Sequence, residues 1–278
     1  MNTRVSTAAS SSVRTLFVGS VSFLNARPLI YGLESCEDLK LSLDVPARLL
    51  EGLRAHHYDV ALLPVIDYQR MENLCIVPGG GIGCDGPTLT VRLFSQQPID
   101  QTRVLACDPD SHTSVALARI ILSEKFGIAP EFIDLRSARG GTGEARLLIG
   151  DKVVCEEPAG FEHQLDLGAA WKEMTGLPFV FAVWIARGAN GGDALDLGDL
   201  PARLIEAKRA GLANVREIVT KYAIPRGWPA GMALQYLTLY LKYDIGPRQL
   251  EAIELFHKKA AAHGIISSDP APLRLYGK

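Results

Sequence analysis

Three short polar segments border apolar runs and hold the residues best suited to acting on a small molecule. They are residues 20–25 (SVSFLN), 88–90 (TLT) and 110–114 (DSHTS). Their hydroxyl, amide and imidazole groups donate and accept hydrogen bonds. This chemistry indicates a site that holds an oxygen-rich ligand.

Two of these segments are expected to open helices, which predicts an anion site. Unpaired backbone N–H groups and the helix dipole both favour a carboxylate at a helix N-terminus. The hydroxyls of Ser111, Thr113 or Ser114 would add donors, and each charge-assisted hydrogen bond contributes about 1.5–3 kcal/mol. The alternative is that these residues only cap their helices. His112 suits a cap or the surface as well as it suits a substrate contact.

No motif points to a metal, a nucleotide or a catalytic triad. The glycine-rich residues 79–86, expected to form a loop, contain neither G-x-G-x-x-G before a helix nor Gly-Lys-Ser/Thr. Histidines and acids lack metal-ligand spacing, and no Ser-His-Asp triad can be assembled from motifs. The five cysteines include no C-x-x-C pair, which argues against disulfides and structural zinc. If the protein is an enzyme, we expect it to use no cofactor.

The elements that position these segments alternate between strands and helices, which predicts an α/β fold with parallel pairing. Strands are expected over residues 15–20, 39–45, 60–63, 89–95, 104–107, 146–149 and 179–185. Helices are expected over residues 25–33, 46–56, 111–126, 200–222, 230–243 and 247–263. Asn25 is a candidate N-cap of the first helix, Asp151 is expected to cap another, and Tyr236 falls at helical packing spacing.

The order of these elements predicts two lobes with a cleft between them. Residues 14–97 and 178–278 are expected to form one discontinuous lobe, and residues 98–177 an inserted second lobe. Residues 1–13 are expected to be a flexible leader. Because loops at the carboxyl ends of the strands face such a cleft, the three polar segments are expected to line it.

The composition predicts a soluble, cytoplasmic protein. The chain has 278 residues, 47% of them hydrophobic, and a net charge of −2, which gives no basic field for nucleic acid. No apolar run approaches the roughly 20 residues that span a bilayer, and no secretory signal is recognisable. We therefore expect a small-molecule ligand, with no nucleic-acid or membrane partner. The sequence does not define an oligomeric state.

Six motifs occur in the order and at the spacing of a known family. They are SFLNARPL (22–29), YDVALLP (58–64), SHTSVAL (111–117), LIGD (148–151), DLG (166–168) with Trp171, and TGLPFVFAVW (175–184). Over about residues 14–265 the chain resembles the MqnA family, the chorismate dehydratases of the futalosine route to menaquinone. The resemblance implies a type II periplasmic-binding-protein fold and a cofactor-independent hydro-lyase that converts chorismate to 3-[(1-carboxyvinyl)oxy]benzoate and water.

The resemblance also implies roles for particular residues. Asn25 would orient the departing hydroxyl or the ring carboxylate, and Thr90 would donate to the same region. Thr90 stands where the family typically has serine, and its methyl narrows the site. No protein general base is apparent, so the substrate's own enolpyruvyl carboxylate is our hypothesis for the base. The residues expected to bind substrate are Ser22, Arg27, Thr88, Ser111, His112, Thr113 and Ser114.

Three other functions fit the same fold. A solute-binding protein for a small carboxylate would need export or a lipid anchor, and the N-terminal residues offer neither. The naphthoate-forming enzyme of the same pathway has different motifs. A regulatory effector domain would normally carry a helix-turn-helix. Fold alone does not decide among these functions; the series of motifs favours the dehydratase.

Overall fold

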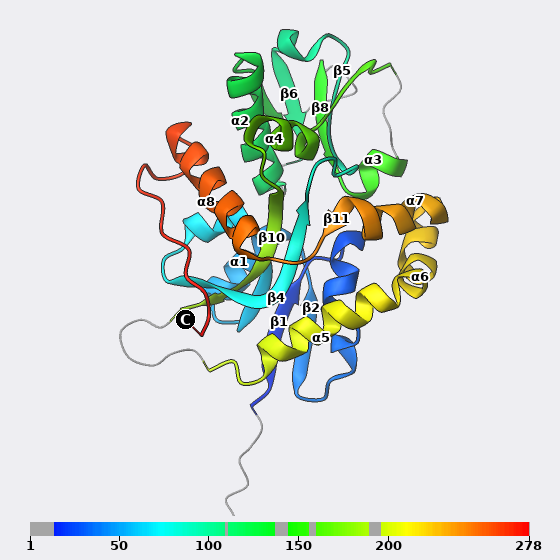
Figure 1. Cartoon of the computed structure of the whole chain (residues 1–278), viewed down its shortest axis with the longest axis vertical. Coiled ribbons are helices and arrows are strands. Elements are labelled where there is room, and N and C mark those ends of the chain that lie inside the picture. The colour runs from blue at the N-terminus through cyan, green and yellow to red at the C-terminus, as the bar shows by residue number, and fades with distance from the viewer. Residues whose placement is uncertain (1–13, 109–110, 137–143, 156–159, 189–195, 278) are drawn as a thin grey trace, which may run out of the picture.

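The computed structural model describes residues 14–108, 111–136, 144–155, 160–188 and 196–277, which form two α/β lobes (Figure 1). Each lobe is built on its own β-sheet. The predicted leader, residues 1–13, lies outside the described residues. The chain passes between the lobes twice, in the crossover at residues 85–90 and in the short link at residues 176–178.

The first sheet contains six strands and forms the lower lobe in Figure 1. In spatial order they are β11 (Leu241–Lys242), β4 (Leu74–Cys84), β10 (Phe179–Arg187), β3 (Val60–Pro64), β1 (Leu16–Ser20) and β2 (Leu39–Leu43). β1 pairs in parallel with β2 and β3, which confirms the predicted parallel unit. β10 runs antiparallel between β3 and β4, so the returning strand closes the sheet at its centre.

The second sheet contains five strands and forms the upper lobe. In spatial order they are β7 (Glu131–Asp134), β6 (Val104–Cys107), β8 (Ala145–Ile149), β5 (Val91–Ser95) and β9 (His163–Asp166). The predicted boundary at residue 98 places β5 in the first lobe, and this is wrong. Leu93 and Phe94 are fully buried in the second sheet, where β5 pairs with β8 and β9.

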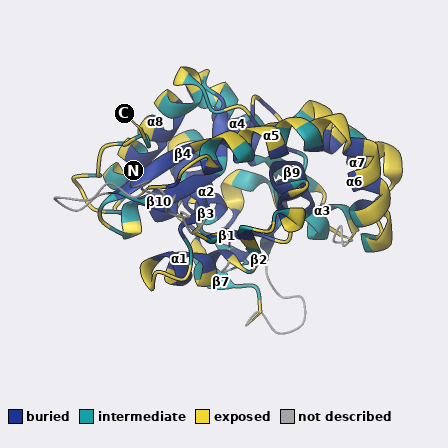
Figure 2. Ribbon diagram, turned by 90° about the horizontal axis from the view of Figure 1, so that it is seen from below, coloured by how far each residue is buried: buried dark blue, intermediate teal, exposed yellow. Residues whose placement is uncertain are grey.

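The described residues form eight α-helices, which pack around the two sheets and expose their outer faces to solvent (Figure 2). They are α1 (Pro46–Arg54), α2 (His112–Phe126), α3 (Asp151–Cys155), α4 (Leu167–Thr175), α5 (Leu200–Ala213), α6 (Val215–Ile218), α7 (Ala230–Gln235) and α8 (Pro247–Ala262). α8 packs against β10 of its own lobe and against α2 of the other. This contact joins the lobes on one side of the molecule.

The helix predicted over residues 25–33 is of a different type. Leu24–Ile30 form a 3-10 helix with Phe23 as N-cap, so Asn25 lies inside its first turn and does not cap it. Pro28 lies within the helix, and the chain turns at Gly32, whose φ is 78°. The two α-helix N-termini expected at the cleft are thereby reduced to that of α2.

The glycine-rich segment predicted as a loop continues strand β4 as far as Cys84. Glycine is required here because β10 lies very close. A Cβ on Gly81 would be 2.5 Å from the Ala182 carbonyl oxygen, and one on Gly83 would be 2.7 Å from that of Phe179. The glycines therefore allow close strand pairing and not a turn.

The two helices predicted over residues 200–222 and 230–243 are each interrupted. The first comprises α5, α6 and a π-helical turn at Val219–Ala223; the second comprises α7, a π-helical turn at Tyr236–Tyr240 and then β11. Pairing of Leu241 with Cys84 in the first sheet ends the second helix early. π-helical turns occur frequently at functional sites, and the second one begins at Tyr236.

His257 on α8 is buried and fixed by two hydrogen bonds. Its side chain is 2% exposed, Nε2 lies 2.9 Å from the Val65 carbonyl oxygen, and Nδ1 lies 2.9 Å from the Gln69 amide nitrogen. A neutral ring with its proton on Nε2 donates to Val65 and accepts from Gln69. Burial lowers the pKa of His257 to about 4.

We expect acidification to destabilise the fold through His257. The unfolded chain binds this proton near pH 6.5 and the folded chain only near pH 4, so stability rises with pH across that window. Between pH 7 and pH 5 the loss due to this ring is about 2 kcal/mol. His257→Gln keeps a donor and an acceptor without titrating, and urea unfolding at both pH values should show a smaller loss. An equal loss in both proteins would contradict this assignment.

Candidate functional site

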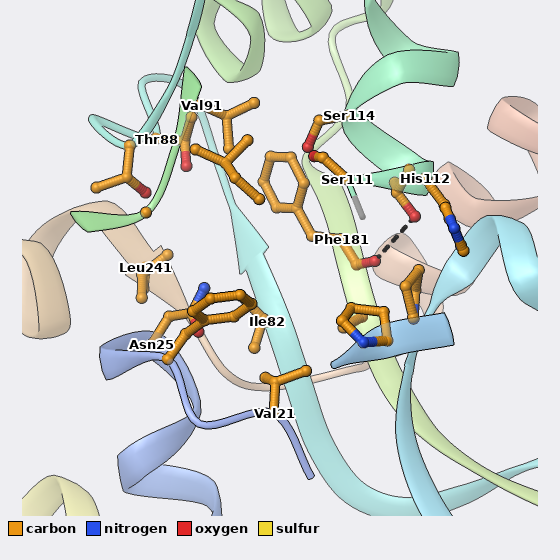
Figure 3. A pocket seen from close by; sticks show the side chains of 18 of the residues that line it. Val21, Asn25, Ile82, Thr88, Val91, Ser111, His112, Ser114, Phe181 and Leu241 are labelled. Carbon is orange, nitrogen blue, oxygen red and sulfur yellow. Dashed lines mark hydrogen bonds between the residues drawn. The ribbon is translucent and has the colours of Figure 1, made fainter. Parts of the chain in front are cut away.

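A cavity of about 730 Å³, including the part open to solvent, lies between the two lobes. Its walls are largely apolar, and Val21, Ile82, Val91, Phe181 and Leu241 line it (Figure 3). Such walls fit a small ring and leave recognition of polar groups to a few side chains.

Three polar side chains meet at one end of the cavity. Thr90 Oγ1 donates to the Tyr236 hydroxyl at 2.8 Å, and the Asn25 side chain hydrogen-bonds the same hydroxyl. The Oδ1 atom of Asn25 is buried and has no partner among the described residues. Burial raises the pKa of Tyr236, and the hydrogen bonds from Thr90 and Asn25 oppose this shift. The Thr90 proton is directed to Tyr236 and not, as expected from the resemblance, to a ligand.

The Asp166 carboxylate holds the crossover that carries Thr88 and Thr90. It accepts hydrogen bonds from the backbone N–H groups of Thr88 and Leu89, at 3.0 and 2.9 Å, and also caps α4 through Ala169 N–H. Leu89 has a φ of 68°, a left-handed conformation outside the β region, so β5 begins only at Val91. Thr88 lines the cavity, as predicted, but from an irregular segment and not from a strand.

The N-terminus of α2 faces the cavity from the second lobe. Ser111, Thr113 and Ser114 are buried and line it, and the Ser111 side chain makes no capping hydrogen bond. Thr113 is already engaged, because its hydroxyl donates to the Phe181 carbonyl oxygen at 3.3 Å (Figure 3) and accepts from Ile66 N–H. Ser111, Ser114 and the first N–H groups of the helix are therefore the donors best placed for an anion.

His112 joins the two lobes at the edge of the cavity. Its Nδ1 lies 2.9 Å from the carboxylate of Asp67, which is fully buried and also pairs with Arg70 at 3.1 Å. Figure 3 shows His112 at the opposite side of the cavity from Asn25 and Thr88. The imidazole thus fixes the start of α2 against the first lobe.

Ser22 and Arg27, both expected to bind substrate, do not line this cavity. The Arg27 guanidinium lies over the Tyr222 ring at 4.2 Å, and it donates to the Ser22 carbonyl oxygen at 3.3 Å. Ser22 itself is exposed. Arg27 therefore packs against the π-helical turn at Val219–Ala223 of its own lobe and not against a ligand in this cavity.

A hydrogen bond across the lobes lies beside the cavity. Asp151, the first residue of α3, accepts from Trp228 Nε1 at 2.7 Å, so it links the lobes in addition to starting its helix. The Trp228 ring stacks on Tyr236 with centroids 5.1 Å apart and planes inclined by 23°. The hydrogen bond between the lobes therefore holds the Trp228 ring, and the Tyr236 ring packs on Trp228.

The charged groups that could offer other chemistry lie away from the cavity. None of the described residues lining it is Asp, Glu, Lys or Arg. No three described His, Cys, Asp or Glu residues are grouped so as to hold a metal ion. Cys107 is buried, and burial raises the pKa of its thiol to about 12. Within the described part of the chain, no helix combines the length and apolar character needed to cross a membrane.

Sequence patterns did not identify two residues of this site. Asp166 precedes an apolar helical run, and this pattern indicates an N-cap. Its hydrogen bond to Leu89 in the crossover joins residues 77 positions apart, so no local pattern predicts it. Tyr236 was expected only to pack, because a regular helix gives no sign of a π-helical turn. The hydrogen bond from Thr90 to Tyr236 joins residues that are far apart in the sequence.

Comparison with known proteins assigns the family. The sequence profile of a family described as menaquinone biosynthesis matches residues 16–262, most of the chain. The chain belongs to this family. Two curated relatives are both named chorismate dehydratase. The relative from Thermus thermophilus is 29% identical over 229 residues, which cover 74% of this chain and 81% of the relative. The relative from Campylobacter jejuni is 26% identical over 179 residues, which cover 60% and 66%.

Solved structures of low sequence identity share the fold of this family member. Protein AF1704 from Archaeoglobus fulgidus has a TM-score of 0.70 at 16% identity and covers 92% of this chain and 100% of its own. The periplasmic aliphatic sulphonate binding protein SsuA from Escherichia coli has a TM-score of 0.61 at 15% identity, with coverages of 95% and 94%. The fold is therefore the predicted two-lobed periplasmic-binding-protein-like α/β fold.

Asp166→Asn is expected to loosen the crossover. The amide keeps one acceptor oxygen and turns an NH₂ group toward backbone donors, so the free energy of unfolding should fall by about 1–3 kcal/mol. Asp85→Asn is the matched control, because Asp85 makes an exposed ion pair with Lys172 next to the same crossover. Urea unfolding should show a change below about 1 kcal/mol for the control. Equal losses in the two variants would show that Asp166 does not organise this segment.

Proposed function

We propose that this protein is a chorismate dehydratase, which removes water from chorismate to give 3-[(1-carboxyvinyl)oxy]benzoate. The observation that carries this proposal is the meeting of Asn25, Thr90 and Tyr236 in an apolar cavity, opposite the α2 N-terminus, in a member of the menaquinone biosynthesis family. The name chorismate dehydratase that both curated relatives carry supports the choice of substrate.

The cavity has a suitable distribution of polar and apolar groups for this substrate. Ser111, Ser114 and the N–H groups at the start of α2 offer neutral donors to a carboxylate. Phe181 and Ile82 offer apolar contact to the ring. The absence of acidic side chains among the described lining residues avoids like-charge repulsion, which is costly where water is excluded.

The reaction requires loss of a ring proton and of the neighbouring hydroxyl. The proton on the carbon that bears the enolpyruvyl group is acidified through the conjugated ring carboxylate, and aromatisation drives the elimination. The base in this proposal is the substrate's own enolpyruvyl carboxylate folded back onto the ring. The protein then contributes mainly by holding the reacting groups in position.

The direct test is incubation of purified protein with chorismate. Loss of the dienyl absorbance, with mass spectrometry of the product, should reveal 3-[(1-carboxyvinyl)oxy]benzoate without added metal or nucleotide. Binding of chorismate without any product would favour a solute-binding protein for a small carboxylate and would refute the dehydratase.

Asn25→Asp is expected to abolish turnover while preserving the fold. The substitution keeps the shape of the side chain, but it brings a negative charge to face the substrate carboxylates in a cavity with largely apolar walls. Asn73→Asp, in the turn before β4, is the control for the same substitution away from the cavity. Initial rates and melting temperatures of both variants should show that only Asn25→Asp is inactive. Wild-type activity in that variant would remove Asn25 from the site.

Substitutions of Thr90 separate hydrogen bonding from packing. Thr90→Val keeps the shape and removes the donor to Tyr236, so the rate should fall about fivefold to a hundredfold, the equivalent of about 1–3 kcal/mol. Thr90→Ser restores the residue typical of the family and should remain active. If Thr90 only packs, Val will be harmless and Ser mildly destabilising. Initial rates and melting temperatures of the two variants distinguish these outcomes.

A further inference from the structure

Two side chains form hydrogen bonds with the phenol oxygen of Tyr236. Thr90 Oγ1 donates from 2.8 Å, and the Asn25 side chain makes the second hydrogen bond. A tyrosine hydroxyl accepts two hydrogen bonds and donates one, so its own proton is directed elsewhere. No hydrogen bond of the described residues has Tyr236 as donor.

The unused proton is directed to the cavity. Tyr236 lines the cavity although it is only 1% exposed. A buried donor without a partner is uncommon in folded proteins and indicates a ligand or water. The Oδ1 of Asn25 is the matching unpartnered acceptor in the same place. A donor and an acceptor side by side fit one hydroxyl group, which donates to Oδ1 and accepts from the tyrosine.

We propose that Tyr236 is the general acid that protonates the departing hydroxyl of the substrate. This inference rests on the proposed dehydratase function and adds a catalytic residue to it. Asn25 Oδ1 would hold the hydroxyl through its hydrogen, and Thr90 would act through Tyr236 as a positioning residue.

The elimination breaks one C–H bond and one C–O bond of the substrate ring. The C–H bond on the enolpyruvyl-bearing carbon breaks, its proton passes to the substrate carboxylate, and its electron pair forms the new ring double bond. The neighbouring C–O bond breaks, and the oxygen leaves with the electron pair of that C–O bond and takes the Tyr236 proton, which yields water. The carboxylic acid then returns a proton to the tyrosinate. No oxidant or reductant is required.

The surroundings of Tyr236 suit this role. Burial raises the pKa of the phenol, so the proton is present at neutral pH. As the proton leaves, the hydrogen bonds from Thr90 and Asn25 stabilise the developing phenolate. The stacked Trp228 ring, linked to Asp151 across the lobes, supports the Tyr236 ring beside the cavity.

Tyr236→Phe tests the proposal because it removes only the hydroxyl and keeps the ring stacked on Trp228. General acids contribute about 10²–10⁴-fold, so kcat for chorismate should fall at least about a hundredfold. The dissociation constant for chorismate, measured by calorimetry, should change less than about threefold, since the group acts mainly in the transition state. Tyr240→Phe, in the same π-helical turn but outside the cavity, is the control and should keep wild-type turnover.

Two results would overturn the proposal. A kcat within about threefold of wild type would show that the proton comes from elsewhere, and a parallel loss of binding and turnover would reduce Tyr236 to a binding residue. If Tyr236→Phe does not fold, Thr90→Val keeps the tyrosine and removes its donor at 2.8 Å, and an unchanged kcat would contradict the stabilisation of a developing phenolate that the proposal requires. Wild-type protein that does not convert chorismate would refute the proposed function, whereas conversion by wild type and Tyr236→Phe alike would refute this inference alone.

Discussion

The geometry of the cavity depends on how the Asp166 carboxylate holds the crossover between the lobes. The carboxylate accepts hydrogen bonds from the backbone N–H groups of Thr88 and Leu89. These bonds stabilise the left-handed backbone conformation of Leu89, which a leucine rarely adopts. This conformation sets Thr90 against the Tyr236 hydroxyl, although β5 and Tyr236 belong to different lobes. Since the same carboxylate caps α4, this partly buried acid links the start of α4 in the second lobe to the polar end of the cavity.

The cavity presents hydroxyl, side-chain amide and backbone N–H donors, since no Asp, Glu, Lys or Arg is found among the described residues that line it. A carboxylate held by N–H and hydroxyl groups keeps its charge without the cost of a buried counter-charge. The nearby cations have other partners: Arg27 stacks on Tyr222, and Arg70 pairs with Asp67. The Oδ1 atom of Asn25 is buried and has no partner among the described residues, and none of their hydrogen bonds has the Tyr236 hydroxyl as donor.

The local elements were predictable because their signals are local. Apolar, β-branched runs mark β1, β3 and β6 as buried strands, and the long apolar stripe after Ser111 marks α2, whose N-terminus does face the cavity. The alternation of these elements predicts two α/β lobes, since connections between parallel strands need helices. The motifs at residues 22–29 and 111–117 predicted the family for the same reason: each is a continuous stretch of chain.

Contacts between distant segments were decided only by tertiary structure. The glycines of β4 resemble a loop until β10 lies against them, and Arg27 resembles a substrate ligand until the fold places it over the Tyr222 ring. Tyr236 has the sequence spacing of an ordinary core residue. Neither its π-helical turn nor its hydrogen bond to Thr90 changes the periodic pattern of apolar residues in the sequence. Sequence periodicity reports which face of an element is buried. It does not report which distant side chain will contact that face. In this protein, contacts between side chains far apart in the sequence form the candidate site.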